Sequence, residues 1–257
     1  MLPVSIIIPC YQAASTLART LDSCVAQPEA AEIIVADDAS TDHSIEVASH
    51  YAKRDARVAL LRMPQNGGAA SARNWAAMHA SQSVLAFIDA DDEYLPGALT
   101  AAGHFLQHNP TAACIRLDVD FAGFPPEITR HPDFDRHAAT LSNTVASTLV
   151  IRRPAYAALG GFPMHSFFRR VGGEDGAFSW ALSRIFGNPR LLGAKGVRMH
   201  HHAGIHAERF FRVSMGMQAS AREDVTEVIR HSTQFVIAAE AAMAQLRDLK
   251  PLDHAAA

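Results

Sequence analysis

Short apolar runs alternate with helical stretches through the first half of this chain. The runs expected to form strands are Val4–Pro9, Glu32–Ala36, Val58–Arg62, Val84–Ile88 and Ala113–Val119. The segments expected to form helices are Ala13–Ala26, Ser44–Arg54, Gly68–Ala80 and Pro96–Gln107. Strands and helices at this spacing form βαβ units, so the pattern predicts an α/β fold with a mostly parallel central sheet covered by helices on both faces.

The second half of the chain is less regular. Residues 121–143 contain scattered prolines and no clear period, which favours a long excursion or lid. The later elements expected are a strand at Thr144–Ile151, helices at Pro154–Leu159 and Asp175–Ile185, an extended segment at Arg190–Met199, and helix from about Phe210 to Leu249. We therefore expect a main domain at residues 1–210 and a C-terminal helical extension at residues 211–257.

Composition limits the classes of function. The formal net charge of -3 gives no electrostatic argument for nucleic-acid binding. The widely spaced Cys10, Cys24 and Cys114 predict free thiols in a reducing compartment. We expect no signal peptide, and no stretch approaches the roughly 20 apolar residues of a transmembrane helix. These features predict a cytoplasmic protein, with attachment to the inner face of a membrane as the alternative.

Three carboxylates follow the fourth expected strand, in the segment Asp89-Ala90-Asp91-Asp92. Acidic side chains that crowd at a strand end repel one another unless a cation offsets their charge. Carboxylate oxygens suit Mg²⁺ or Mn²⁺, and such ions are commonly held by one or two carboxylates together with substrate phosphates. The segment therefore predicts a metal site for a phosphorylated ligand. The alternative is an acidic N-cap for the helix near Leu95.

Polar clusters also follow the first three expected strands, and we expect all four clusters to meet at one edge of the sheet, where ligands of such sheets bind. Asp38 could accept the N–H of a uracil ring, and Tyr11 could lie against a base. Gly68 allows a close backbone approach at a helix N-terminus that favours anions. Arg73 could reach a phosphate or pair with an Asp.

Each of these residues also has a purely structural interpretation. Ser40, Thr41 or Asp42 is expected to cap the helix that starts at Ser44. The Gly68 segment could be only a turn, and Arg73 only an ion pair. Pro96 is expected in the first turn of its helix.

Four motifs, in this order and spacing, are similar to those of the family 2 glycosyltransferases. The motifs are Val4-Ser5-Ile6-Ile7-Ile8-Pro9-Cys10-Tyr11, Asp37-Asp38-x-Ser40-Thr41-Asp42, Asn66-x-Gly68-x-x-x-Ala72-Arg73-Asn74 and Asp89-x-Asp91-Asp92. The likeness continues through Ile151-Arg152-Arg153 and Gly160-Gly161-Phe162 to Gly173-Glu174-Asp175. The resemblance implies the GT-A fold, a Rossmann-like α/β fold, and an inverting enzyme that uses nucleotide-diphosphate sugars.

The resemblance also implies a role for each matching residue. Asp91 matches the acid that holds the metal on the diphosphate, with Asp92 beside it. Asp175 matches the catalytic base, with Glu174 beside it, although these two acids could instead only cap a helix. The positions that match donor-binding residues are Pro9, Tyr11, Asp38, Asn66, Gly68, Arg73 and Asp89.

The reaction implied is a one-step displacement at the anomeric carbon. Mn²⁺ or Mg²⁺ held at Asp91 would stabilise the leaving nucleoside diphosphate, and Asp175 would accept the proton of the acceptor hydroxyl. A helix N-terminus weakens the basicity of Asp175, so we expect a compensating apolar or acidic neighbour, with Glu174 as a candidate. The expected partners are a nucleotide-diphosphate sugar, with UDP preferred, and a sugar, lipid-linked or other hydroxyl acceptor.

Two other functions share part of this pattern. A nucleotidyltransferase would also use a nucleotide-binding sheet and acidic metal ligands, but the segment after the first strand lacks its Gly- and Lys/Arg-rich phosphate loop. A non-catalytic nucleotide-sugar-binding protein would retain the donor site alone. The joint presence of Asp38, Asp91 and Asp175 speaks against the second alternative.

A histidine cluster follows the last expected strand. The resemblance implies a His there on the metal or the diphosphate. His202-Ala203-Gly204 is a closer local match than His200, so His202 is the expected third metal residue.

Three further features lead to separate expectations. Ala39 stands where glycine is common in the family, which requires that its backbone avoid a strongly left-handed conformation. Gln12 stands where Asn is common and could alter a loop hydrogen bond. The C-terminal helix carries Phe235, Val236 and other apolar residues on one side, and either packs on the main domain or pairs with a second copy as a homodimer.

Overall fold

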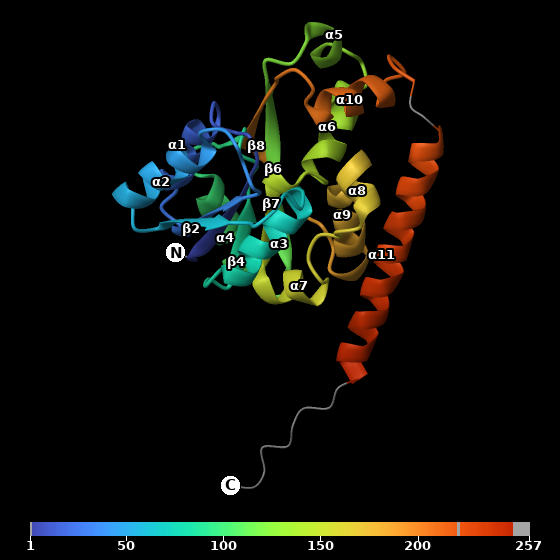
Figure 1. Cartoon of the computed structure of the whole chain (residues 1–257). Helices are drawn as coiled ribbons and strands as arrows, with labels where there is room; N and C mark the ends of the chain where they lie inside the picture. The colour runs from blue at the N-terminus through green and yellow to red at the C-terminus, as the bar shows by residue number, and fades with distance from the viewer. Residues whose placement is uncertain (1, 220–221, 249–257) are drawn as a thin grey trace, which may run out of the picture.

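The computed structural model describes residues 2–219 and 222–248. Its centre is one 8-stranded sheet with the strand order β3-β2-β1-β4-β7-β6-β8-β5 (Figure 1). In chain order the strands are β1 (Val4–Cys10), β2 (Ala30–Asp37), β3 (Val58–Arg62), β4 (Val84–Phe87), β5 (Glu93–Tyr94), β6 (Cys114–Ala122), β7 (Leu149–Arg152) and β8 (Arg190–His200).

Helices connect and cover these strands. They are α1 (Leu17–Val25), α2 (Ser44–Arg54), α3 (Ala69–His79), α4 (Ala98–His108), α5 (Pro126–Thr129), α6 (Phe134–Ser142), α7 (Arg153–Ala158), α8 (Ser166–Val171), α9 (Glu174–Ile185), α10 (His206–Ser214) and α11 (Arg222–Asp248), together with the short 3₁₀ helix η1 (Ala146–Thr148).

The sheet is mixed, with its parallel part formed by the first half of the chain. β1 pairs in parallel with β2 and β4, β2 with β3, and β6 with β8. The antiparallel pairs are β4 with β7, β7 with β6, and β5 with β8. The α/β fold with a mostly parallel sheet that the sequence predicts is therefore confirmed.

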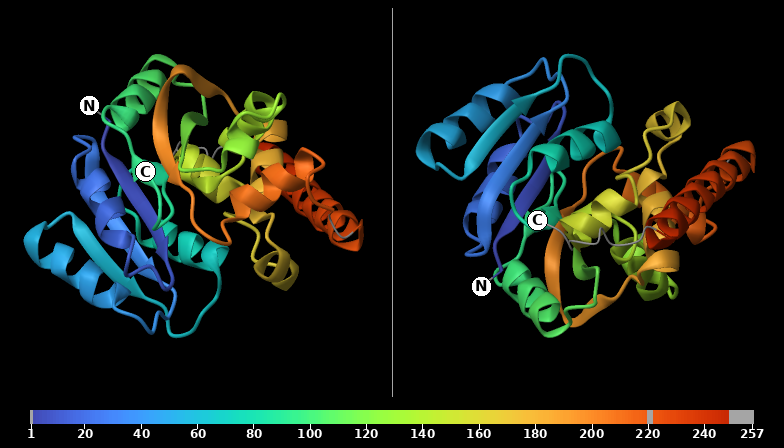
Figure 2. Two further views of the ribbon diagram at one scale, coloured as in Figure 1. Left: turned by 90° about the horizontal axis from the view of Figure 1, so that it is seen from above. Right: turned by 90° about the horizontal axis from the view of Figure 1, so that it is seen from below.

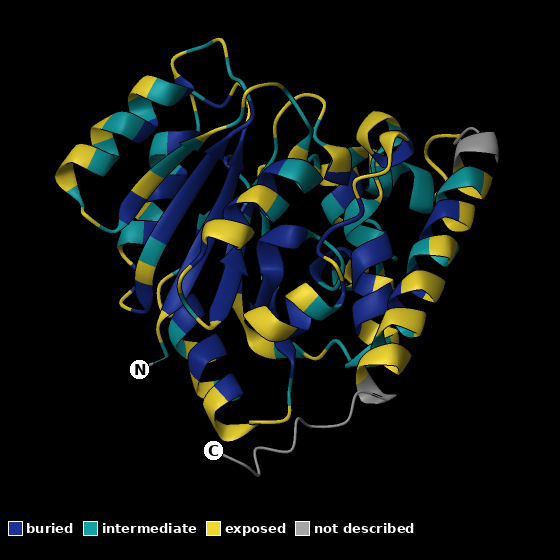
Figure 3. Ribbon diagram, turned by 60° about the horizontal axis from the view of Figure 1, so that its bottom comes forward, coloured by how far each residue is buried: buried dark blue, intermediate teal, exposed yellow. Residues whose placement is uncertain are grey.

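Both faces of the sheet are buried, because successive side chains of a strand point to opposite sides. Ile6 and Ile8 of β1 pack in a core with residues of α1 and α4, whereas Ile7 packs with α3, α9 and α11 on the other face. Figure 2 shows helices on both sides of the sheet, and Figure 3 shows that its strands are largely buried. This two-sided burial explains why the parallel strands are continuous apolar runs.

The structure corrects the expected N-terminal ends of helices α2 and α4. The N-cap of α2 is His43 and not Ser40, Thr41 or Asp42, although the Asp42 carboxylate accepts the Ser44 N–H at 3.0 Å. α4 begins only at Ala98, after Gly97 in a left-handed conformation. Pro96 therefore lies outside the helix, and the acidic segment 89–92 does not cap it.

The structure also corrects two longer segments. Residues 121–143 are no irregular lid, because β6 extends to Ala122 and α5 and α6 occupy most of the rest. The apolar spacing of Phe134, Ala138 and Leu141 buries one side of α6, a helical signal that the neighbouring prolines and charges obscured. The expected strand Thr144–Ile151 is instead η1 followed by β7, and β5 and α8 were not predicted.

The C-terminal helix α11 lies along α9 and near α8 (Figure 1). Val236 and Ala239 are buried against the core, and Arg184 of α9 pairs with Glu240 at 3.0 Å. Packing on the main domain, one of the two expected arrangements, is thus confirmed, and pairing with a second copy stays a prediction. Leu249 lies outside the described residues.

The boundary expected between residues 210 and 211 falls inside α10. Phe211 of this helix is fully buried and makes ring contacts with Phe121, Phe124 and Phe134. α10 thus packs with residues that precede the boundary, and the division of the chain into two domains stays a prediction. Among the described helices, none has the length and apolar character needed to cross a membrane.

Candidate active site

The loops after β1 and β2 are joined by hydrogen bonds at one edge of the sheet. The Asp38 N–H donates to the Cys10 carbonyl at 2.8 Å. The Gln12 side chain accepts the N–H groups of Thr41 and Asp42, each at 3.0 Å, and donates to the Thr41 hydroxyl at 2.9 Å. Gln12 therefore joins the two loops through its side chain, and whether it alters a hydrogen bond relative to Asn stays a prediction.

Two residues of these loops have left-handed backbones. Gln12 has φ 52° and Ala39 has φ 61°. The expectation that Ala39 avoids this region is wrong, and the alanine carries strain that glycine would not. The hydrogen bonds around Gln12 hold the loop in this conformation.

The Asp38 carboxylate fixes the glycine turn that precedes α3. It accepts the N–H of Gly67 at 2.6 Å and that of Gly68 at 2.8 Å, and Asp38 is only 2% exposed. Asn66 donates to the Asp38 carbonyl and accepts from Arg169 of α8 at 3.1 Å. Gly68 must be glycine, because its φ is 86° and an added Cβ would lie 3.2 Å from Cγ of Arg169. These residues lie on the same edge of the sheet as Tyr11, which is 53% exposed, and Pro9, which is buried within β1.

Arg73 is the centre of the candidate site. Its buried guanidinium lies 2.6 Å from Asp89 Oδ1, 3.0 Å from Asp175 Oδ1 and 3.4 Å from Glu174 Oε1. Burial acts to lower the pKa of Arg73, but the three carboxylates outweigh it and raise that pKa above its usual value. Arg73 thus joins the acidic motif after β4 to the acids that open α9, which are far apart in sequence.

The pKa of Asp175 lies close to neutral. Burial raises its pKa to about 7; Arg73 opposes this, Glu174 and Asp89 add to it, and the Ala146 N–H, 3.2 Å from Oδ2, lowers it. The compensation that the sequence argument required is therefore present, and burial contributes more to it than Glu174 does. The N-cap of α9 is Gly173 with no side-chain hydrogen bond, so Glu174 and Asp175 are not its N-cap.

The three acids after β4 have different environments. Asp89 faces Arg73, while the Asp91 carboxylate lies 2.9 Å from Nε2 of His202 and is partly exposed. Asp92 is buried and accepts the Ser147 hydroxyl at 2.7 Å, and the same hydroxyl accepts the Asp89 N–H at 3.1 Å. Burial and the neighbouring acids raise the pKa of Asp92 well above its usual range. Asp91 is therefore the acid of this motif that contacts His202 and has a partly exposed side chain.

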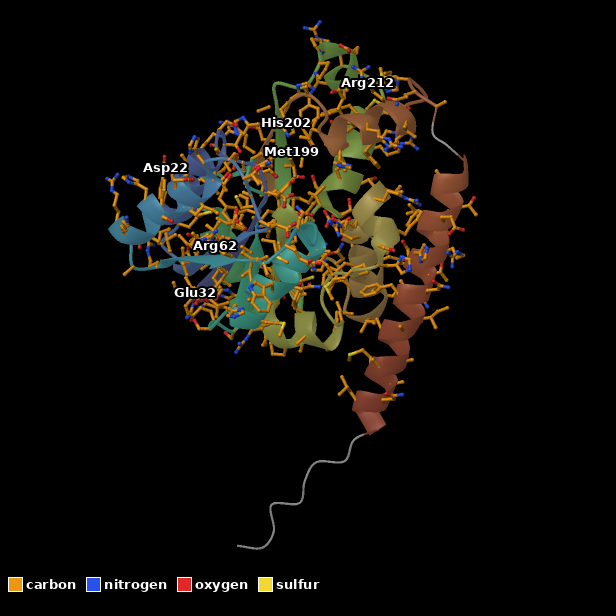
Figure 4. All side chains as sticks on the ribbon, viewed as in Figure 1. Asp22, Glu32, Arg62, Met199, His202 and Arg212 are labelled. Carbon is orange, nitrogen blue, oxygen red and sulfur yellow. The ribbon has the colours of Figure 1, made fainter. Side chains whose placement is uncertain are left out.

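The histidines after β8 have separate partners. His200 contacts Glu93 at 2.7 Å, and His201 contacts Glu208 at 2.8 Å. His202 lies beyond the end of β8, above Met199 in Figure 4, and is the histidine that contacts Asp91. Within residues 2–219 and 222–248, no three His, Cys, Asp or Glu side chains form a metal-binding group. Asp91 and His202 offer one carboxylate and one imidazole, which suit Mn²⁺ or Mg²⁺ when phosphate oxygens supply the other ligands.

Several residues of the site were not anticipated from the sequence. η1 contributes the Ala146 N–H to Asp175 and the Ser147 hydroxyl to the acidic motif. The signal available was a pair of polar residues, Ser147 and Thr148, inside an apolar run that otherwise resembled a strand. The fully buried Arg116 of β6 also binds this turn, and its sign in the sequence was a single Arg near the apolar start of a strand.

Comparison with models of protein families shows which family this chain belongs to. The model of glycosyl transferase family 2 matches residues 5–170, which contain the four motifs of the first half except for Val4. This chain belongs to glycosyl transferase family 2. Glu174 and Asp175 lie just beyond the matched range.

Curated relatives of this family 2 glycosyltransferase are longer proteins. The chain is 37% identical over 137 residues to the succinoglycan biosynthesis protein ExoU of Rhizobium meliloti, across 53% of this chain and 39% of ExoU. It is 33% identical over 105 residues to the UDP-Glc:alpha-D-GlcNAc-diphosphoundecaprenol beta-1,3-glucosyltransferase WfaP of Escherichia coli, across 40% of this chain and 41% of WfaP. The chain thus spans less than half the length of these relatives.

Solved structures share the fold over most of the chain. S. aureus TarS 1–349 in complex with UDP-GlcNAc superposes with a TM-score of 0.67 and 19% identity, covering 91% of this chain and 66% of TarS 1–349. The mannosyltransferase PcManGT of Pyrobaculum calidifontis, in complex with GDP-Man and Mn²⁺, gives a TM-score of 0.63 and 20% identity, covering 98% of this chain and 77% of PcManGT. The family 2 enzyme therefore has the GT-A fold.

Proposed function

We propose that this enzyme transfers a sugar from a nucleoside diphosphate to a hydroxyl acceptor with inversion at the anomeric carbon. The observation that carries the proposal is the position of Asp175. Its carboxylate, with a pKa raised to about 7, is tied through Arg73 to Asp89 of the acidic motif. A base at neutral pH therefore lies next to the expected donor site.

The donor nucleotide is proposed to bind at the edge formed by the loops after β1, β2 and β3. The nucleoside would lie between Tyr11 and the turn that Asp38 holds. Asp89 would lie near the ribose, with Arg73 beside the base and the diphosphate. Among the described residues, Arg73 Nε is buried without a hydrogen-bond acceptor, which supports a ligand atom nearby.

The residues that would hold a divalent ion are Asp91 and His202. Mn²⁺ and Mg²⁺ both suit this donor set, and the ion supplies Lewis-acid stabilisation of the leaving diphosphate when bound. The complex of PcManGT with Mn²⁺ and GDP-Man supports a metal at this edge. We assign Asp92, expected as a metal residue, to holding the loop through Ser147, because its carboxylate is buried and already bound.

Asp175 is the proposed acceptor of the proton that leaves the acceptor hydroxyl. The acceptor hydroxyl would approach the anomeric carbon from the face opposite the diphosphate and transfer its proton to Asp175. Glu174 and Asp89 help to keep the pKa of Asp175 near neutral, while Arg73 stabilises the ionised form. One in-line step with an oxocarbenium-like transition state inverts the centre.

We propose UDP as the donor nucleotide and a glycan of the cell envelope or an exopolysaccharide as the product. The support is the naming of WfaP as a UDP-glucose-dependent transferase, the UDP-GlcNAc complex of TarS and the succinoglycan assignment of ExoU. The cytoplasmic location stays a prediction.

The test begins with a thermal-shift panel of UDP, UDP-glucose, UDP-GlcNAc and GDP-mannose, each with and without Mn²⁺. A ligand that binds only the folded state raises the melting temperature, so one UDP-sugar is expected to do so in a Mn²⁺-dependent manner. Incubation of that donor with acceptors should release UDP and give a product of inverted configuration by NMR. Release of pyrophosphate would favour a nucleotidyltransferase, and Mn²⁺-dependent binding without transfer to any acceptor would favour a binding protein.

A further inference from the structure

The strongest unexplained feature of this molecule is a buried arginine beneath the site. Arg116 of β6 has no exposed surface. Its guanidinium donates to Asn188 Oδ1 at 3.0 Å, to the Val145 carbonyl at 2.7 Å and to Oγ1 of Thr148 at 3.2 Å. It also donates to the Ser179 hydroxyl at 2.6 Å. Every acceptor is neutral, so a buried positive charge has no carboxylate partner within the described residues.

Burying the Arg116 guanidinium without a carboxylate partner costs folding free energy. A buried charge without an opposite charge loses its hydration, and neutral acceptors recover only part of that loss. Burial accordingly lowers the pKa of Arg116 to about 10, and electrostatic interactions with Cys114 and with the Asp175 carboxylate oppose this effect. Arg116 still carries its charge at neutral pH. A group retained at this cost calls for an explanation beyond packing.

The partners of Arg116 are the parts that position Asp175. Ser179 lies four residues after Asp175 and therefore on the same side of α9. Val145 and Thr148 flank the turn whose Ala146 N–H binds Asp175 and whose Ser147 hydroxyl binds Asp92 and the Asp89 N–H. One guanidinium therefore holds both the helix that carries Asp175 and the turn that binds its carboxylate.

We propose that Arg116 is a positioning residue for the transfer reaction, which fixes η1 and α9 so that the Asp175 carboxylate is held in place, and whose unpaired charge favours the ionised form of that carboxylate. This inference rests on the proposed role of Asp175 as the base. Arg116 touches none of the residues assigned to the donor.

The other charged and titratable groups around Asp175 are few and come from different elements. They are Arg73 of α3, Asp89 after β4, Glu174 of α9 and Tyr156 of α7. Arg73 already lies between three carboxylates, so its charge is shared. Within the described residues no carboxylate contacts Arg116, and Asp175 is a carboxylate that its charge reaches, so the removal of Arg116 should be felt at Asp175.

The experiment compares Arg116→Gln with the wild-type enzyme in steady-state kinetics across pH. We expect kcat to fall by about tenfold or more, as for loss of an oriented proton acceptor. The acid limb of kcat/KM should move up by about half a pH unit or more, because a Coulomb contribution to the carboxylate is removed. The affinity for UDP with Mn²⁺, measured by calorimetry, should not change. Arg116→Lys retains a positive charge and should return the acid limb toward that of the wild type.

Arg152→Gln is the matched control. Arg152 of β7, like Arg116, donates to neutral acceptors, here the backbone carbonyl oxygens of Ala112 at 2.9 Å and Leu106 at 2.8 Å. Its loss should lower the melting temperature and leave the acid limb in place. An acid limb of Arg116→Gln that coincides with the wild type overturns the proposal, as does an equal loss of kcat in both variants.

Thr148→Val carries the test if Arg116→Gln does not fold. This variant removes a hydroxyl that accepts a hydrogen bond from Arg116 and leaves the charge of Arg116. We therefore expect kcat to fall several-fold with UDP affinity unchanged, and an unchanged kcat contradicts the proposal.

Asp175→Asn distinguishes a failure of the proposed base from a failure of the proposed role of Arg116. If Asp175→Asn keeps full transfer activity, the proposed base is wrong; if it is inactive while Arg116→Gln behaves as the wild type, only the role of Arg116 is wrong.

Discussion

At the scale of single residues, we expect the environment of Asp175 to determine the pH dependence of the reaction. Its pKa is raised to about 7, mainly by burial. The carboxylate must be ionised to accept a proton, so we expect kcat/KM to fall about tenfold per pH unit below that value. A profile measured between pH 5 and 9 with a saturating acceptor checks this. A flat profile down to pH 5 would mean that Asp175 is not the base, or that its surroundings do not raise its pKa.

The same pKa has a consequence for stability. The folded-state pKa of Asp175 lies above the usual aspartate value of 3.8, so the protonated carboxyl contributes stability that is fully present below pH 3.8 and is lost as the pH rises through about 7. The enzyme therefore keeps a destabilising ionised group at the pH where it works, as is common at functional sites.

Ala39 offers a test of stored backbone strain. At φ 61° an alanine costs more than glycine, so Ala39→Gly should raise the free energy of unfolding by about 0.5–1 kcal/mol. Urea unfolding measures the difference. Gln12→Gly is the contrasting variant, because it relieves the same kind of strain at φ 52° but removes the hydrogen bonds to Thr41 and Asp42. A stability gain in Gln12→Gly equal to that of Ala39→Gly would show that these hydrogen bonds contribute nothing.

At the scale of elements, the attachment of α11 can be tested with two adjacent residues. Val236 is 5% exposed and Ile237 is 60% exposed. Val236→Ala should lower the free energy of unfolding by about 2 kcal/mol, because it leaves a cavity against the core. Ile237→Ala should change it by less than about 0.5 kcal/mol. Equal effects of the two variants would contradict the packing of α11 on α9.

Elements with strong periodicity could be predicted from the sequence, and weakly patterned ones could not. The ranges of α2 and β3 match their predictions, because apolar spacing and local turn residues agree there. η1 was predicted as a strand, because Val145, Leu149 and Val150 suggest one and the contacts that bend the chain come from Arg116 and Asp175. The two-residue β5 depends on pairing with β8, which no local pattern reveals.

At the scale of the whole molecule, Arg73 links the two halves of the chain. It extends from α3 to acids that follow β4 and that open α9. Arg73→Met would leave three carboxylates without their cation, so we expect the free energy of unfolding to fall by about 2–4 kcal/mol at pH 8. The loss should be smaller at pH 5, where the carboxylates are more easily protonated. Urea unfolding at both pH values measures this, and a pH-independent loss would mean that Arg73 acts through packing alone.

The sequence predicted which residues meet at the edge of the sheet, because the strand-end rule brings loops of parallel strands together. It could not predict that Asp38 holds the glycine turn, that Asp92 is buried against Ser147, or that Arg73 pairs with three acids. These pairings depend on side-chain directions across elements that are distant in sequence. The roles of the individual residues in binding and transfer stay predictions.

The most direct measurement is a comparison of Asp175→Asn with the wild-type enzyme, using the donor that the thermal-shift panel identifies. Asn keeps the size of the side chain but cannot accept the proton of the acceptor hydroxyl. We predict that kcat falls by about 10²–10⁴-fold while the enzyme stays folded and its affinity for UDP with Mn²⁺ is retained. Transfer at the wild-type rate in a folded Asp175→Asn enzyme would contradict the assignment of Asp175 as the base and the mechanism built on it.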